Sequence, residues 1–272
     1  MAIITISRGS FSGGKSLAEC TASRLGYSCV SREVLVGAAV KRYDVPEQKL
    51  YNSLTKKPGI LEHLTREKYH YLMCLRASLV SLARDEQVVY HGHAGHLLLK
   101  GVPHLVRVRV IASIEFRVSS VMSGQHMSRK DAAEYIEKVD EERNKWTRFL
   151  YHEDWNNPSL YDIVVNIDQL GVADACEILC HIANMEQYRT TAASQKLLKD
   201  LALGTDVRGL IACDAAKKGV ADAGIEIEAD DGIVTISGTV ASLEESDRIK
   251  EMINSVPGVR GVNSKIEVWP HW

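Results

Sequence analysis

The residues with the clearest chemical signature are Gly9 to Ser16, which read Gly-Ser-Phe-Ser-Gly-Gly-Lys-Ser. They match Gly-x-x-x-x-Gly-Lys-Ser/Thr, a loop whose backbone N–H groups hold phosphate oxygens. In this chemistry Lys15 reaches the β- and γ-phosphates and the Ser16 hydroxyl binds Mg²⁺. The alternative is a glycine-rich turn that binds nothing. We predict a nucleoside-triphosphate site with these phosphate contacts: Gly9, Ser12, Gly13, Gly14, Lys15, Ser16 and Leu17.

Two elements are expected to position this loop. Ala2 to Ile6 is a short apolar run with β-branched residues, which predicts a buried strand. After the loop, apolar residues recur at helical spacing as far as Leu25, and Gly26 is a favourable residue to end that helix. A strand, a phosphate loop and a helix in this order are the context that the motif requires.

Three cationic positions are further candidates for binding an acceptor group. Arg32 stands at the start of a predicted helix, as an acceptor-phosphate contact or as a solvated surface arginine. Arg76 is embedded among apolar residues of a long helix predicted from Ile60 to Glu86, where it extends to solvent or points into a cleft. His93 lies in His91-Gly92-His93-Ala94-Gly95-His96, which offers metal ligands in one interpretation. The interpretation we favour is a ligand-binding turn at the end of a strand.

Strands are also predicted at residues 87–90, 105–112 and 161–166, with helices between them. Strands that alternate with helices indicate a mostly parallel sheet with right-handed crossovers. We therefore predict an α/β fold in which a P-loop NTPase-type parallel sheet is flanked by helices.

A strongly charged helix is expected to begin at Ser128, where Asp131 completes a capping box. This helix carries Asp140, Arg143 and Arg148. Such charges form either a solvated face, held by weak i,i+4 pairs, or a lid over a phosphate.

The C-terminal segment has its own pattern. Alternating residues around Asp230-Asp231-Gly232 predict a β-hairpin, because Asp-Gly is a strong turn signal. Residues 242–256 predict an amphipathic helix and residues 262–268 a last strand. We expect two domains, 1–189 and 190–272, and the second is a small α/β domain.

Composition excludes some partners and locations. The chain has 272 residues, is 45% hydrophobic and 25% charged, and carries a net charge of −2, so we expect no nucleic-acid partner. No apolar run approaches the roughly 20 residues that span a bilayer. The N-terminus lacks the basic leader of a signal peptide. Beside a nucleotide motif, the six scattered cysteines indicate reduced thiols and a cytoplasmic location.

Residues 1 to about 186 resemble the cytidylate kinase-like family, a branch of the nucleoside monophosphate kinases. The segments that carry the resemblance are Ile-Thr-Ile-Ser-Arg with Ser12-Gly13-Gly14-Lys15-Ser16, Ser31-Arg32-Glu33-Val34-Leu35, Val110-Ile111-Ala112 before the Arg117 helix, Asp140-x-x-Arg143, and Tyr161-Asp162-Ile163-Val164-Val165-Asn166 with Asp168. The resemblance implies Mg-ATP as phosphoryl donor and CMP or dCMP as acceptor. It also implies a lid with Arg143 and Arg148 as catalytic residues beside Lys15, oriented by Asp140, and an acceptor site with Arg32, Arg76 and His93.

One departure from the family pattern affects the acceptor site. Typical cytidylate kinases have Gly-Arg-Asp or Gly-Arg-Gly after the second central strand, whereas this chain has Gly92-His93-Ala94-Gly95. A histidine that is largely neutral replaces a charged bidentate donor. Two hypotheses follow. One is a Mg-ATP-dependent kinase of CMP or a related acceptor. The other is a nucleotide-binding sensor with little or no kinase activity.

The last seventy or so residues resemble a BON domain. The resemblance rests on the segments Asp231-Gly232-Ile233-Val234-Thr235-Ile236-Ser237-Gly238-Thr239-Val240 and Val256-Pro257-Gly258-Val259-Arg260-Gly261-Val262-Asn263. It implies a small α/β module that binds a hydrophobic ligand or a protein partner. A role only in self-association, giving a homo-oligomer, is the alternative. In either hypothesis for the first domain, this module has a regulatory or interaction role.

Overall fold

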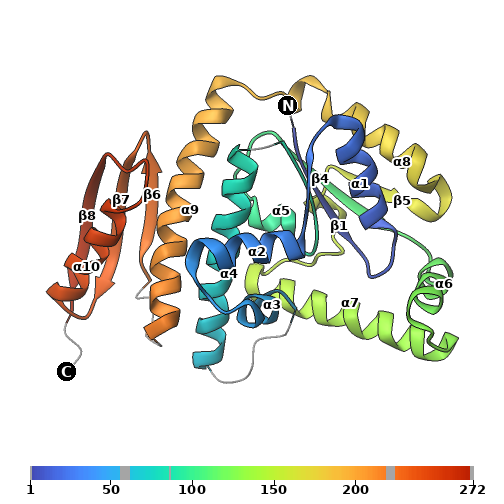
Figure 1. Ribbon diagram of the computed structural model, residues 1–272, viewed down its shortest axis with the longest axis horizontal. Coiled ribbons are helices and arrows are strands. Elements are labelled where there is room, and N and C mark those ends of the chain that lie inside the picture. Colours follow the sequence, from blue (N-terminus) through green and yellow to red (C-terminus); the bar gives the residue numbers. More distant parts are fainter. Residues whose placement is uncertain (1, 56–61, 86, 219–223, 270–272) are drawn as a thin grey trace. The chain divides into compact units, whose positions relative to one another are not determined.

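The computed structural model describes residues 2–55, 62–85, 87–218 and 224–269, which form two compact units (Figure 1). The first, here called the P-loop unit, contains residues 2–34, 55, 85 and 87–190 of this set. The second contains residues 35–54, 62–84, 191–218 and 224–269. The described helical residues between 35 and 84 thus belong to the same unit as the C-terminal segment, and the P-loop belongs to the other unit. Both ends of the predicted long helix, Ile60, Leu61 and Glu86, lie outside the described residues.

The P-loop unit is built on a five-stranded sheet in the order β2-β3-β1-β4-β5, and every neighbouring pair is parallel. The strands are β1 (Ile3–Arg8), β2 (Ser28–Ser31), β3 (Val88–His91), β4 (Leu105–Ile111) and β5 (Ile163–Asn166). The apolar β1 lies in the centre and is buried along most of its length, as predicted. Because all strands run in one direction, their carboxyl ends meet at one edge of the sheet, where the phosphate loop follows β1.

Helices cover this sheet, and two of the helix ends, at Gly26 and Ser128, follow predicted signals. The helices and turns are α1 (Gly14–Leu25), α5 (Gly95–Leu98), α6 (Ile114–Gln125), α7 (Arg129–Tyr151), α8 (Ile167–Ala183), and the 3₁₀ turns η1 (Pro158–Leu160) and η2 (Glu186–Tyr188). Gly26 ends α1 with φ 70°, and the Ser113 side chain caps α6. At the start of α7 the Ser128 hydroxyl oxygen accepts a bond from the Asp131 N–H at 3.2 Å.

The main core of this unit joins α1 and α8 to the sheet, and the two helices lie side by side (Figure 1). Ile4 and Ile6 of β1 and Leu17 of α1 are fully buried there. A smaller core joins α6 to α7 and also holds the tip of the phosphate loop. In it, the Phe11 ring lies 5.9 Å from the Tyr135 ring, so the loop is anchored to α7.

The second unit combines a helical part with a three-stranded sheet in the order β6-β7-β8. Its elements are α2 (Arg32–Tyr43, of which residues 32–34 belong to the P-loop unit), α3 (Glu47–Thr55), α4 (Glu62–Asp85), α9 (Ala192–Lys218), β6 (Glu226–Asp230), β7 (Ile233–Val240), α10 (Leu243–Asn254) and β8 (Gly261–Val268). β6 and β7 form the predicted hairpin, and positive φ values at Asp231 and Gly232 fit its tight turn. β8 returns parallel to β7 after α10.

Helix α9 contacts both parts of the second unit. One face of it contributes Val207 to the core of the small sheet. Another face approaches α2 and α4 so closely that a Cβ at Gly209 would lie 2.6 Å from Oη of Tyr43. The buried Asp206 carboxylate also forms an ion pair with Arg42 at 2.5 Å. α9 therefore joins the small sheet and the α2–α4 helices into one body.

Two disulfides correct the expectation of reduced thiols. One joins Cys20 of α1 to Cys176 of α8, with Cα atoms 6.1 Å apart. The other joins Cys74 of α4 to Cys213 of α9, with Cα atoms 6.5 Å apart. Both partners of each bond lie in one unit. Among the helices that the structure describes, none combines the length and hydropathy needed to span a bilayer.

Candidate functional site

The phosphate loop between β1 and α1 is a closed turn that depends on its glycines. The Ser12 hydroxyl donates to the Gly9 carbonyl oxygen at 3.0 Å, which closes the loop on itself. Gly13 has φ 74°, a conformation that favours glycine. A Cβ at Gly14 would lie 2.5 Å from Cδ of Arg8, so a larger residue fits only if the arginine moves.

The start of α1 presents backbone donors at the end of this loop. The Leu17 N–H donates to the Gly13 carbonyl oxygen at 3.1 Å, the first hydrogen bond of the helix. The N–H groups of Gly14, Lys15 and Ser16 precede it, and the N-cap glycine supplies no side-chain cap. Such donors, together with the positive end of the helix dipole, bind anions. The predicted Leu17 contact differs from the others, because its N–H is already used within the helix.

The Lys15 and Ser16 side chains are exposed at this terminus. Nζ of Lys15 lies 3.7 Å from the Glu19 carboxylate, and the two side chains are 67% and 54% exposed. A surface ion pair of this kind contributes only about 0–1 kcal/mol. The lysine therefore remains available to an incoming anion.

Asp140 and Arg117 hold the other end of the loop by Ser10. Asp140, on α7, accepts bonds from the Ser10 N–H at 3.3 Å and the Ser10 hydroxyl at 3.0 Å. Arg117, on α6, donates to the Ser10 carbonyl oxygen at 2.7 Å and to Asp140 at 2.5 Å. The predicted role of Asp140 was to orient Arg143. In the structure its hydrogen bonds go to Ser10 and Arg117, and it acts on Arg143 only through charge.

Arg143 and Arg8 bring more positive charge to the loop. Arg143 donates to the Arg8 carbonyl oxygen at 3.0 Å. Desolvation lowers the pKa of Arg143 to about 10; Asp140 opposes this shift, and neighbouring arginines add to it. Burial and Arg32 likewise lower the pKa of Arg8. Its buried Nε has no hydrogen-bond partner among the described residues.

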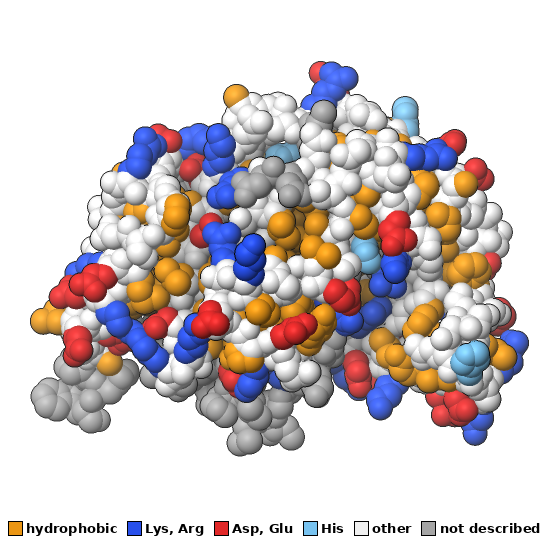
Figure 2. Space-filling view, in the orientation of Figure 1, with side chains coloured by type: hydrophobic (Ala, Val, Ile, Leu, Met, Phe, Trp, Pro, Cys, Tyr) orange, Lys and Arg blue, Asp and Glu red, His pale blue; other side chains and the backbone are white. Residues whose placement is uncertain are grey.

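These side chains form a group that we call the loop arginines: Arg8, Arg32, Arg117 and Arg143. Asp140 acts on Arg143 and Glu33 acts on Arg8, each in the direction that raises the pKa of the arginine. On the face that Figure 2 shows, acidic and basic side chains are interspersed. A local excess of arginine beside helix N–H groups is suited to a polyphosphate, which can form charge-assisted hydrogen bonds with several of them.

Of the remaining predicted residues, Arg32 belongs to the loop arginines, whereas Arg148 pairs outside that group and Arg76 is in the second unit. Arg32 is at the start of α2 and donates two hydrogen bonds to Glu33. Arg148 forms an ion pair with Asp154 at 2.7 Å, and 61% of its side chain is exposed. Arg76 is half-buried on α4, in the second unit. The roles predicted for these three side chains stay predictions.

The three histidines at and after the end of β3 have different surroundings. His91 is buried, and its pKa is lowered mainly by this burial and to a smaller extent by the positive charge of Arg8. Nε2 of His93 lies 3.0 Å from the Thr147 hydroxyl of α7. Nδ1 of His96 lies 3.0 Å from the Ser7 hydroxyl of β1. Among the described residues no three His, Cys, Asp or Glu side chains gather as a metal site, so the metal interpretation of this turn has no support.

Arg8 and Arg117 are the site residues that the sequence-based list omits. The sequence does offer an indication for Arg8, because this residue stands between the predicted buried strand and the first glycine of the motif. Arg117 is one of several arginines on predicted helices, and nothing local distinguishes it. Its importance becomes visible only with Asp140, 23 residues away along the chain.

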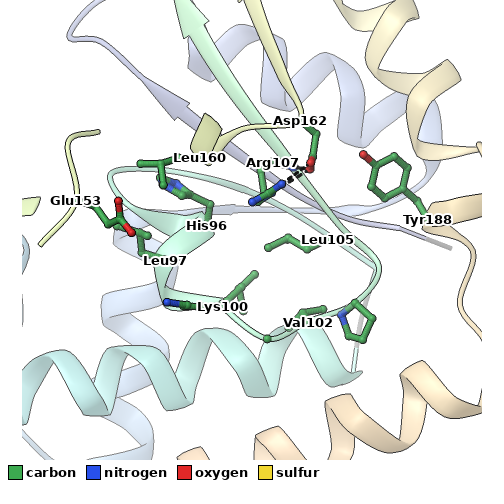
Figure 3. Close-up of a pocket in the computed structure, with 13 residues that line it drawn as sticks. His96, Leu97, Lys100, Val102, Leu105, Arg107, Glu153, Leu160, Asp162 and Tyr188 are labelled. Carbon is green, nitrogen blue, oxygen red and sulfur yellow. Dashed lines mark hydrogen bonds and ion pairs between the residues drawn. The ribbon is translucent and has the colours of Figure 1, made fainter. Parts of the chain in front are cut away.

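A separate cavity of about 360 Å³ lies beside the start of β4 (Figure 3). Arg107 reaches into it, but its guanidinium is bound to Asp162, at 2.6 Å in the shorter of two side-chain bonds. Two carboxylates in its lining, Glu153 and Asp162, and an arginine that is already paired make this cavity a poorer phosphate site than the loop.

Comparisons with known proteins agree with this geometry. Residues 3–169 match the model of the cytidylate kinase-like family, and residues 199–270 match the BON domain. No protein with a curated description matches the chain.

One solved structure shows a similar fold. The chain is similar to an uncharacterized protein from Eubacterium ventriosum, with a TM-score of 0.55 and 19% identity over 67% of this chain and 98% of that one. It is also similar to shikimate kinase from Bacteroides thetaiotaomicron, with a TM-score of 0.43 and 12% identity over 68% and 99% of the two chains. Since the first family model spans more than half of its residues, this chain belongs to the cytidylate kinase-like family and carries a C-terminal BON domain.

Proposed function

We propose that the P-loop unit binds Mg-ATP and transfers its γ-phosphoryl group to a nucleoside monophosphate, with CMP or dCMP as favoured acceptor. The observation that carries this proposal is the set of loop arginines around a glycine loop with free helix N–H groups. Family membership supports the same reaction class. Phosphoryl transfer depends mainly on positioning and charge neutralisation, which such a cluster can supply.

Each part of the site has a distinct task in this mechanism. The N–H groups at the start of α1 and the Lys15 ammonium hold the phosphates of the donor. Arg143, fixed against the Arg8 carbonyl oxygen, faces the charge that develops on the transferred group. Nε of Arg8, which has no hydrogen-bond partner among the described residues, is a further donor for a phosphate oxygen.

The residues also fit a metal ion that arrives with the nucleotide. Mg²⁺ keeps several waters and is usually bound through substrate phosphates and one or two protein oxygens. The exposed Ser16 hydroxyl is the protein oxygen that would hold it here. Held there, the ion would supply positive charge that offsets the negative charge of the phosphates.

A panel of nucleoside monophosphates with ATP and Mg²⁺ tests the proposal. CMP-dependent formation of ADP supports it, and ATP binding without turnover on any acceptor contradicts it. Lys15→Ala provides the matching binding test. ATP at about 100 times its Kd stabilises a protein by about 2.7 kcal/mol, and the variant should lose most of that shift. An unchanged shift would argue against the loop as the ATP site.

The second candidate function is a nucleotide-binding sensor with little kinase activity. It is favoured by His93, which the family resemblance places at the acceptor but whose Nε2 is engaged with Thr147.

In either case we propose that the BON domain has a regulatory or interaction role, through a hydrophobic ligand, a protein partner or self-association. We also propose a cytoplasmic location, where ATP is made. The two disulfides weigh against it, since disulfides are rare in that compartment.

A further inference from the structure

His93 lies in the turn after β3, and its ring packs against α7 and the chain that follows it. The ring centroid is 4.9 Å from that of Trp146 and 5.6 Å from that of Trp155, both in edge-on arrangements. Both tryptophans are buried. The imidazole thus packs against two aromatic rings, and its Nε2 atom contacts the Thr147 hydroxyl.

The hydrogen bonds around Thr147 determine the tautomer of His93. The Thr147 hydroxyl lies 2.9 Å from the Arg143 carbonyl oxygen, and only the hydroxyl can donate in that bond. A hydroxyl has one proton, so at its other contact it must accept a hydrogen bond. Nε2 of His93 is therefore the donor, and the neutral ring carries its proton there. Nδ1 is then without a proton, and it is buried without a partner among the described residues.

The surroundings disfavour a positive charge at this position. Arg143 on α7 and His96 on α5 are the titratable groups that act on the ring. Burial, then Arg143, lowers the pKa of His93 well below its ordinary value. An arginine here would place a permanent cation beside Arg143. Neutral histidine supplies a hydrogen-bond donor without adding that charge.

We infer that His93 is a positioning residue for Arg143: its neutral Nε2–H group holds the Thr147 hydroxyl, which holds the turn of α7 that carries Arg143. Thr147 stands one helical turn after Arg143, and the Arg143 guanidinium reaches the Arg8 carbonyl oxygen at the phosphate loop. The inference rests on the proposed function, because it assigns Arg143 to the transferred phosphoryl group. It gives His93 a task other than direct contact with the acceptor.

Matched variants test the role in turnover. His93→Gln keeps a donor near the position of Nε2, and Thr147→Ser keeps the hydroxyl. His93→Phe and Thr147→Val keep the approximate shape but remove the hydrogen bond. We expect the second pair to lower kcat with CMP by roughly 10- to 100-fold, as a displacement of about 1 Å at a reacting centre does. The first pair should stay near wild type, and KM for CMP should change little in all four.

Equal losses in His93→Gln and His93→Phe, or a change mainly in KM for CMP, would overturn the inference. Such a result would indicate direct contact with the acceptor. If His93→Phe does not fold, Thr147→Val compared with Thr147→Ser gives the same test at the other end of the bond.

A second measurement does not depend on any acceptor. Nitrogen NMR of the imidazole groups should show His93 as the Nε2–H tautomer at about pH 7, with no titration near its ordinary pKa of about 6.5. An Nδ1–H tautomer, or titration near that value, would overturn the inference. If the wild type turns over no acceptor but the NMR result holds, the proposed kinase function fails while the positioning of α7 stands.

Discussion

Replacing Asp140 by asparagine should weaken the P-loop unit in the absence of nucleotide and should matter less in its presence. The change keeps one oxygen for the two Ser10 bonds and places an NH₂ group where Arg117 now donates at 2.5 Å. It also removes a negative charge that raises the pKa of Arg143 and so offsets part of the lowering caused by desolvation.

The structure bounds the size of the effect. A hydrogen bond to a charged group contributes about 1.5–3 kcal/mol when buried. The side chains of Arg117 and Asp140 are 14% and 25% exposed, and solvent screening favours the lower part of that range. We expect a loss of about 1–2 kcal/mol. At about 2–4 °C per kcal/mol for a chain region of this size, Tm should fall by about 2–8 °C.

Thermal unfolding with and without ATP is the assay. The triphosphate of ATP supplies negative charge to the same loop arginines, so the difference in Tm between Asp140→Asn and wild type should narrow at saturating ATP. Glu142→Gln is the matched control, because it removes an exposed carboxylate from the same helix and should stay within about 0.5 kcal/mol. A variant as stable as the control, or a difference that ATP leaves unchanged, would refute the role given to this carboxylate.

Three other perturbations have defined outcomes. Arg143→Ala should reduce turnover by roughly 10²-fold or more while ATP affinity changes much less; steady-state kinetics and calorimetry decide this. Cys74→Ser removes the disulfide between α4 and α9 and should destabilise the second unit by about 2–4 kcal/mol, an effect that reductant should reproduce in wild type but not in the variant. Burial, then nearby arginines, lowers the pKa of His96 to about 4, so the unfolded chain binds the proton more readily than the folded one. Stability should therefore fall by up to about 3 kcal/mol as the pH drops from about 6.5 to 4, and His96→Asn should flatten that dependence in pH-resolved melting curves.

Local patterns predicted many elements because they reflect local backbone preferences. The phosphate loop, the Gly26 end of α1 and the Asp231-Gly232 turn depend on residues that tolerate positive φ, and the structure has these conformations. The hairpin between β6 and β7 follows from that turn and the alternation on either side of it.

Strand β2, in contrast, was not predicted. Its four residues, Ser28 to Ser31, include only one fully buried side chain, Val30. Such a short polar segment becomes a strand because β3 offers a parallel partner at the edge of the sheet. The exposure of its side chains and its pairing with β3 are set by the tertiary structure and not by the segment itself.

By itself the sequence determined the phosphate loop, the parallel α/β architecture and the small C-terminal domain, because glycine placement and hydrophobic periodicity act over a few residues. Only the tertiary structure decided what surrounds the loop. Asp140 meets Ser10 across 130 residues, and His93 meets Thr147 across 54. The disulfides close separations of 156 and 139 residues. Such contacts depend on how helices pack on the sheet and on each other, and no local spacing specifies that.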